Sequence, residues 1–141
     1  MEQAVFESIG YSTACPDCGA ELECWGVQAL VNGSLRWDTE STCSACRFTL
    51  AACGGDMPAE LRSRLLSERG PARLQVDPSA SNTVIMRVLR AELGLGLADV
   101  RSVLSRVVTG GYSGTLPEME FLARKLRASG IDAAADQLKE L

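Results

Sequence analysis

The sequence predicts an α+β fold in which a β-rich, cysteine-bearing unit precedes a compact β-α-α-β-α-β unit. Three observations predict it. Four cysteines form two Cys-x2-Cys pairs in the first third of the chain, β-forming residues lie between the pairs, and helix-capping residues recur in the second half. The predicted boundaries place the cysteine-bearing unit at residues 1–57, a connecting helix at 58–70 and the compact unit at 71–141.

The overall composition is that of an ordinary globular protein, and it removes several catalytic classes. The 141 residues are 46% hydrophobic and 23% charged, unlike those of a disordered chain. There is no histidine, which excludes Ser-His and Cys-His catalysis and every histidine metal ligand. No apolar run approaches the roughly 18 residues of a membrane-spanning helix, and residues 1–10 lack the pattern of a secretion signal. We therefore expect a cytoplasmic protein without a membrane anchor.

Charge is distributed unevenly along the chain. The net charge is −4 at pH 7. Residues 1–58 contribute eight acidic and two basic side chains, whereas residues 59–141 contribute ten acidic and twelve basic ones. Non-specific nucleic-acid binding draws its affinity from summed positive charge. We therefore do not expect nucleic acid as the partner.

The two cysteine pairs predict a metal site. They occur in the runs Cys-Pro-Asp-Cys-Gly and Cys-Ser-Ala-Cys. Such a turn points two sulfurs at a centre about 2.3 Å away, and a second turn completes a tetrahedron. Between the pairs, Asn32-Gly33 is a strong hairpin signal between β-rich residues 22–31 and 35–42. The hairpin brings the two turns together.

This arrangement resembles a zinc ribbon. The resemblance implies one structural Zn²⁺ bound by Cys15, Cys18, Cys43 and Cys46. Because thiolates fill all four positions, no coordination site stays open for catalysis. The alternative is a disulfide or free thiols, which a chain that is not secreted disfavours.

Two further cysteines, Cys24 and Cys53, are interpreted as small buried hydrophobic residues. No histidine or lysine is adjacent to lower a thiol pKa. A redox pair or a second metal site is the alternative. The roles of Trp25 and Trp37 are also left open between a small ribbon core and a recognition surface.

A short helix is predicted after the cysteine-bearing unit. Asp56 is the expected N-cap, Pro58 falls in the first turn, and Gly70-Pro71 ends the helix. One apolar stripe is expected to pack against a neighbouring domain, and it consists of Leu61, Leu65 and Leu66.

The second half predicts the element order β-α-α-β-α-β. The first helix is capped by Ser81 and ends at Gly94. The second spans residues 98–107, and the third opens with the capping box Thr115-Leu116-Pro117-Glu118 and ends at Ser129-Gly130. The expected strands are residues 72–76, a short strand around Tyr112, and residues 131–135.

Residues 72–141 resemble the C-terminal domain of the bacterial ribosomal stalk protein, to whose fold the adaptor ClpS is related. The resemblance lies in the run Gly-Leu-Gly-Leu-Ala-Asp-Val-Arg at 94–101, the Gly-Thr-x-x-Glu opening of the last helix and its Leu-Arg-Ala-Ser-Gly ending. The family's domain recruits translation factors through a basic, partly apolar face. The resemblance implies that face at Met86, Arg87, Arg90 and Arg101.

The match to that face is partial. Asn82 and Ala98 stand where the family has lysines. The cysteine-bearing unit replaces the family's N-terminal dimerisation helices and hinge, so a ribosomal stalk protein itself is not expected. From the residues alone, a docking face and an ordinary solvated charged face both stay open.

These observations together predict a non-enzymatic protein-binding module or adaptor. The candidate partners are a translation factor, an ATP-driven machine, or a toxin whose basic surface the acidic unit masks. The alternative is a zinc-ribbon protein that binds nucleic acid or a transcription complex. An enzyme is not predicted, because no nucleophile is paired with a base and no carboxylates form an acid/base pair.

Overall fold

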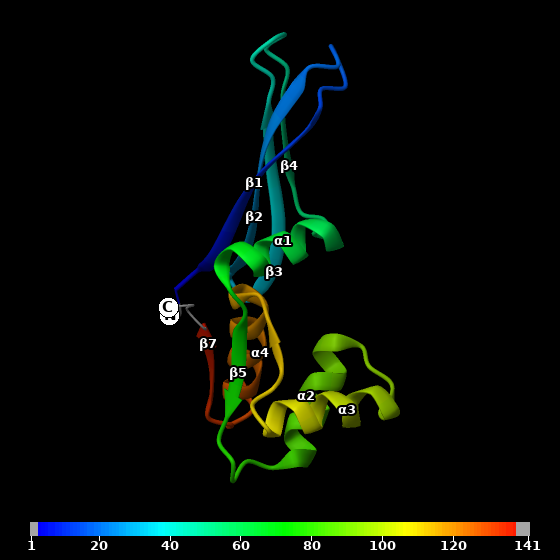
Figure 1. The fold of residues 1–141 in the computed structure, drawn as a ribbon. Coiled ribbons are helices and arrows are strands. Elements are labelled where there is room, and N and C mark those ends of the chain that lie inside the picture. The colour runs from blue at the N-terminus through cyan, green and yellow to red at the C-terminus, as the bar shows by residue number, and fades with distance from the viewer. Residues whose placement is uncertain (1–2, 138–141) are drawn as a thin grey trace. The chain divides into compact units, whose positions relative to one another are not determined.

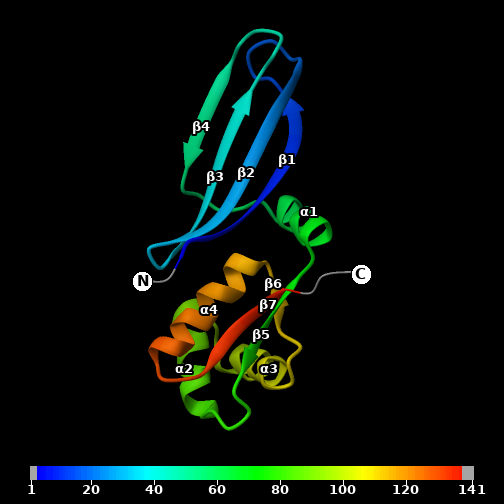
Figure 2. The same cartoon turned by 90° about the vertical axis from the view of Figure 1, so that its left-hand side faces the viewer.

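The protein comprises two compact units, residues 1–68 and residues 69–141 (Figure 1). The computed structural model describes residues 3–137. Within these residues the first unit contains a four-stranded antiparallel sheet and one helix, and the second contains a three-stranded sheet and three helices (Figure 2). The fold is therefore α+β, as the sequence predicts.

The sheet of the first unit has its strands side by side in chain order. They are β1 (Val5–Ala14), β2 (Glu21–Val31), β3 (Ser34–Thr42) and β4 (Thr49–Cys53). The predicted hairpin is present as β2 and β3, and its turn residues Asn32 and Gly33 both have positive φ, 51° and 78°. Two positive φ values are what a type I′ hairpin turn requires. The edge strands β1 and β4 were not predicted.

The helix α1 (Ala59–Arg69) packs against one face of this sheet. Leu61 and Leu65 of the predicted stripe lie against Ile9 and Trp37, and all four side chains are buried. Leu66 is only half-buried. This cluster is small, so hydrophobic burial alone stabilises the first unit little.

The start of α1 differs from the prediction. The backbone N–H of Arg62 donates to the carbonyl of Pro58 (3.0 Å), which makes Pro58 the capping residue. Asp56 lies two residues before it and is therefore not the N-cap. The first helical residue is Ala59.

The second unit has the predicted element order. Its elements are β5 (Ala72–Val76), α2 (Asn82–Leu93), α3 (Leu97–Val108), β6 (Ser113–Gly114), α4 (Leu116–Ala128) and β7 (Ala133–Gln137). The sheet order is β6-β5-β7, with both pairings antiparallel. Ser81 caps α2, Gly94 ends it at φ 64°, and Thr115 and Glu118 form the predicted capping box.

The core of the second unit is larger than that of the first. Buried side chains of three helices and the central strand pack together, and they include Leu74, Ile85, Leu89, Val100, Leu122 and Leu126. The last strand begins two residues later than predicted, at Ala133. The backbone N–H of Ile131 donates to the carbonyl of Leu126 (3.0 Å), so Ile131 closes the end of α4 instead of starting the strand.

A close approach in the first unit gives a test of this packing. A methyl group added at Gly26 would overlap the ring of buried Trp37, so we expect Gly26→Ala to lower the free energy of unfolding by about 2 kcal/mol. Tryptophan emission during urea unfolding measures this, because both tryptophans lie in the first unit. The control is Gly10→Ala, whose new methyl group meets only the ring of exposed Trp25. Equal losses in the two variants would contradict the packing described.

Candidate metal centre and basic cleft

Two turns of the first unit share one backbone geometry. In the turn between β1 and β2, the N–H of Gly19 donates to the carbonyl of Cys15 (2.9 Å). In the turn between β3 and β4, the N–H of Arg47 donates to the carbonyl of Cys43 (2.9 Å). Each turn closes with a further backbone bond, from Cys15 to Ala20 (2.7 Å) and from Cys43 to Phe48 (2.8 Å). Both turns therefore present their cysteines in the same way.

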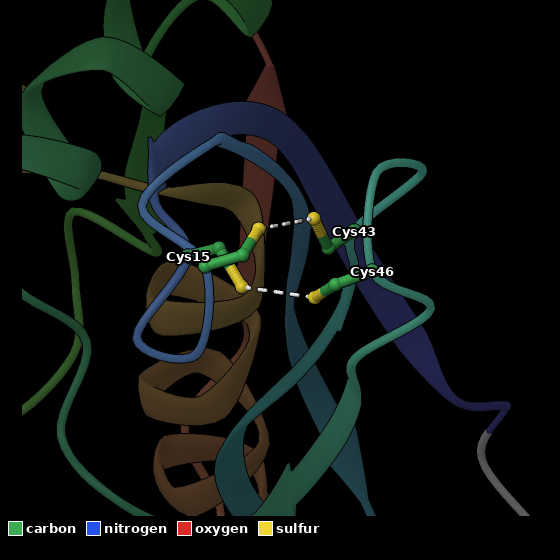
Figure 3. A group of neighbouring side chains, drawn as sticks. Cys15, Cys43 and Cys46 are labelled. Carbon is green, nitrogen blue, oxygen red and sulfur yellow. Dashed lines mark hydrogen bonds between the residues drawn. The ribbon is translucent and has the colours of Figure 1, made fainter.

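The four cysteine sulfurs of these turns converge on one point. The sulfur of Cys15 lies 3.6 Å from that of Cys46, and the sulfur of Cys18 lies 3.6 Å from that of Cys43. All four lie within 4.8 Å of one another, with the two pairs facing each other across a small gap (Figure 3). A tetrahedron with metal–sulfur bonds of about 2.3 Å has edges of about 3.8 Å. The cluster is thus a site that can hold a metal ion.

Three thiols of the cluster have shifted pKa values. The backbone N–H of Cys46 donates to the sulfur of Cys43 and, against burial, holds the pKa of Cys43 at about 7. The N–H of Phe48 acts in the same direction on Cys46, but burial and the other three thiols outweigh it and raise the pKa of Cys46 to about 12. The backbone N–H of Ala20 lowers the pKa of Cys18, but hydrogen bonds with the thiols of Cys43 and Cys15, together with burial, raise it overall. The Cys43 thiol therefore ionises readily, whereas the thiols of Cys18 and Cys46 resist ionisation, and a bound dication would remove this resistance.

The surroundings of the sulfurs are partly apolar. Cys15 and Cys43 are buried, Cys46 is half-buried, and Cys18 is exposed. Leu22 packs in the same cluster. Cys18 is thus the most exposed of the four cysteines.

The two remaining cysteines have different environments. Cys24 is buried beside the cluster, as predicted, and its sulfur accepts a hydrogen bond from the hydroxyl of Ser41 (3.3 Å). The same prediction is wrong for Cys53, which is exposed because it ends the edge strand β4. The strand register places the two on opposite faces of the sheet, since Cys24 lies opposite Ser41 and Cys53 opposite Asp38. A disulfide between them within one chain would need the sheet to open.

The predicted basic face lies on the second unit. Met86, Arg87 and Arg90 line a cleft of about 710 Å³ that runs along α2 and the turn that follows it. The structure places Arg101 elsewhere, as an exposed residue of α3 that does not line this cleft. Sequence reasoning missed the apolar part of the lining, Leu95 and Leu97. The signal that could have found it is the pair of leucines in a Gly-Leu-Gly-Leu turn, where little chain is available to bury them.

The arginine side chains of α2, α3 and α4 differ in the hydrogen bonds and ion pairs that they form. Within the described part of the chain, the side chains of Arg87, Arg90 and Arg101 make no hydrogen bond or ion pair. On α4, by contrast, Arg124 and Arg127 both bind Glu120, at 2.9 Å and 3.2 Å. The guanidinium groups of Arg87, Arg90 and Arg101 are available to a partner, whereas that of Arg106 on α3 lies over the ring of Tyr112.

Comparison with known proteins identifies no relative of this chain. No family model, curated protein or solved structure matches the chain. Among the described residues, no helix combines the length and apolar character that crossing a bilayer requires. The function is therefore inferred from the geometry of the cysteine cluster and of the cleft on α2.

The residue after the second cysteine differs between the two turns, and this difference predicts opposite effects on stability. Gly19 has φ 78°, and the equivalent residue of the second turn, Arg47, has φ 67°. Side chains are strained there by roughly 1 kcal/mol. We expect Gly19→Ala to destabilise the metal-loaded first unit by about 1 kcal/mol and Arg47→Gly to stabilise it by up to about 1 kcal/mol. Urea unfolding followed by tryptophan emission measures both, and effects of the same sign would contradict the equivalence of the turns.

Proposed function

We propose that this protein is a non-enzymatic, zinc-containing protein-binding module or adaptor of the cytoplasm. The observation that carries the proposal is the cleft on α2, where arginines without partners surround an apolar lining. Flexible methionine supplies adaptable contact area, and guanidinium groups supply bidentate contacts to carboxylates. The partner proposed is therefore a protein with an acidic, partly apolar surface, such as a translation factor or an ATP-driven machine.

Zinc is the metal proposed for the cysteine cluster. Four thiolates in tetrahedral arrangement favour zinc or iron, and zinc needs no redox partner. The role proposed is structural, because all four positions are filled by the chain's own sulfurs. The reducing cytoplasm keeps such thiols available as ligands. The small apolar clusters of the first unit leave much of its stability to the metal.

Metal analysis of the purified protein tests this part of the proposal. We expect about one zinc ion per chain, and we expect its removal by a chelator to unfold the first unit while the second unit stays folded. Tryptophan emission reports the first unit, and helical circular dichroism is dominated by the second, which holds three of the four described helices. Cys43→Ser should abolish zinc binding, whereas Cys53→Ser should leave it unchanged. Iron in place of zinc, or full zinc content in Cys43→Ser, would contradict it.

Affinity capture from native lysate tests the partner face. We expect Arg87→Ala/Arg90→Ala to lose the proteins that the unmodified protein captures, since both side chains line the cleft. The matched control is Arg47→Ala/Arg73→Ala, which removes the same charge from exposed arginines outside the cleft. Arg101→Ala, tested separately, shows whether the partner extends over α3. If the double variant retains every specific partner, the basic-face proposal is wrong.

A nucleic-acid titration addresses the alternative function. Because eight of the ten charged side chains in residues 1–58 are acidic, we expect labelled duplex and single-stranded DNA to bind weakly. Micromolar affinity that falls steeply with salt would instead favour the nucleic-acid-binding interpretation.

A further inference from the structure

One face of the first unit's sheet is not covered by its helix. Residues directly opposite each other in an antiparallel pair point to the same face. Ile9 and Trp37, which contact α1, are odd-numbered residues of β1 and β3. The other face, here called the open face, therefore carries the even-numbered residues of β1 and β3 and the odd-numbered residues of β2 and β4.

The open face exposes two large aromatic side chains. Phe6 is 65% exposed and Trp25 is 51% exposed, whereas Trp37 on the covered face is 7% exposed. The ring of Trp25 lies against Gly10 of the neighbouring strand, where an added methyl group would come within 2.8 Å of it. Glycine at this position lets the indole lie over the sheet with its outer surface in solvent. Large exposed aromatics on a sheet are typical of interaction sites.

Carboxylates surround this tryptophan. Glu40 lies directly opposite Trp25 on β3, and Glu23 is the next residue of β2 on the same face. Neither carboxylate forms an ion pair or hydrogen bond within the described part of the chain. The one basic residue that the described strands place on the open face, Arg36, pairs with Asp38 at 3.4 Å. The open face is thus acidic around an exposed indole.

We propose that the open face docks a basic segment of a partner protein, with an arginine or lysine side chain seated over Trp25 between Glu23 and Glu40. An indole face attracts a cation within about 6 Å of the ring, and carboxylates beside it add charge-assisted hydrogen bonds. The same charges repel the phosphates of nucleic acid, which leaves protein as the occupant. This inference extends the proposed function, because it gives the first unit a docking surface separate from the cleft on α2.

The test uses the full, zinc-loaded chain and a short peptide of alternating arginine and serine. Nuclear magnetic resonance resolves one indole N–H signal for each of the two tryptophans. We expect the peptide to shift the Trp25 signal and to leave that of buried Trp37 in place. Glu23→Gln/Glu40→Gln should weaken the peptide's affinity about tenfold. The matched control, Glu60→Gln/Glu68→Gln, removes the same charge from exposed positions of α1, and should retain most of the affinity.

Several results would overturn the proposal. These are an unmoved Trp25 signal, equal weakening in the two double variants, undiminished binding of a peptide with neutral citrulline in place of arginine, or a Trp25 shift caused by DNA. Both glutamate double variants leave Arg87 and Arg90 unchanged. Failure of the proposed docking on the open face is therefore distinguishable from failure of the proposed docking at the cleft on α2. Retained folding of Glu23→Gln/Glu40→Gln is checked by the Trp37 signal.

Discussion

The convergence of four sulfurs is the constraint on which the first unit depends. Each cysteine pair occupies the turn of a hairpin, β1–β2 or β3–β4, and the two turns lie at the same end of the sheet (Figure 2). A metal bound there would join the two hairpins at the end of the sheet where the turn residues no longer pair between strands. The β2–β3 turn at the other end needs no such link, since Asn32 and Gly33 satisfy its geometry locally.

This constraint explains why the sheet can leave one face uncovered. A four-stranded sheet without a second layer on both faces buries little apolar area, and here α1 covers one face only. The second unit shows the opposite solution, in which three helices and a sheet enclose a continuous apolar core without any cysteine. Cross-linking by a bound metal would therefore allow the first unit to keep a face with solvent-exposed aromatic side chains.

Local signals made most of the predicted elements accessible from sequence. The hairpin turn, the capping box at Thr115 and the glycine at the end of α2 each depend on residues within one turn of the chain, and the structure has all three. Edge strands and exposure depend on non-local pairing, which is why β1, β4 and the exposure of Cys53 were missed. The different fates of Trp25 and Trp37 follow from strand register, which single-residue hydrophobicity does not encode. The resemblance to the ribosomal stalk domain stays a prediction.

The two proposed docking surfaces carry opposite charge, and this has a consequence for specificity. A basic segment that complements Glu23 and Glu40 is repelled by the free guanidinium groups of Arg87 and Arg90, and an acidic segment is repelled by the open face. Each surface therefore rejects the partner of the other through like charge as well as selecting its own through contact. Discrimination of this kind needs no communication between the units. A chain with the two proposed surfaces would bind two chemically distinct segments independently, which is the property that the proposed adaptor function requires.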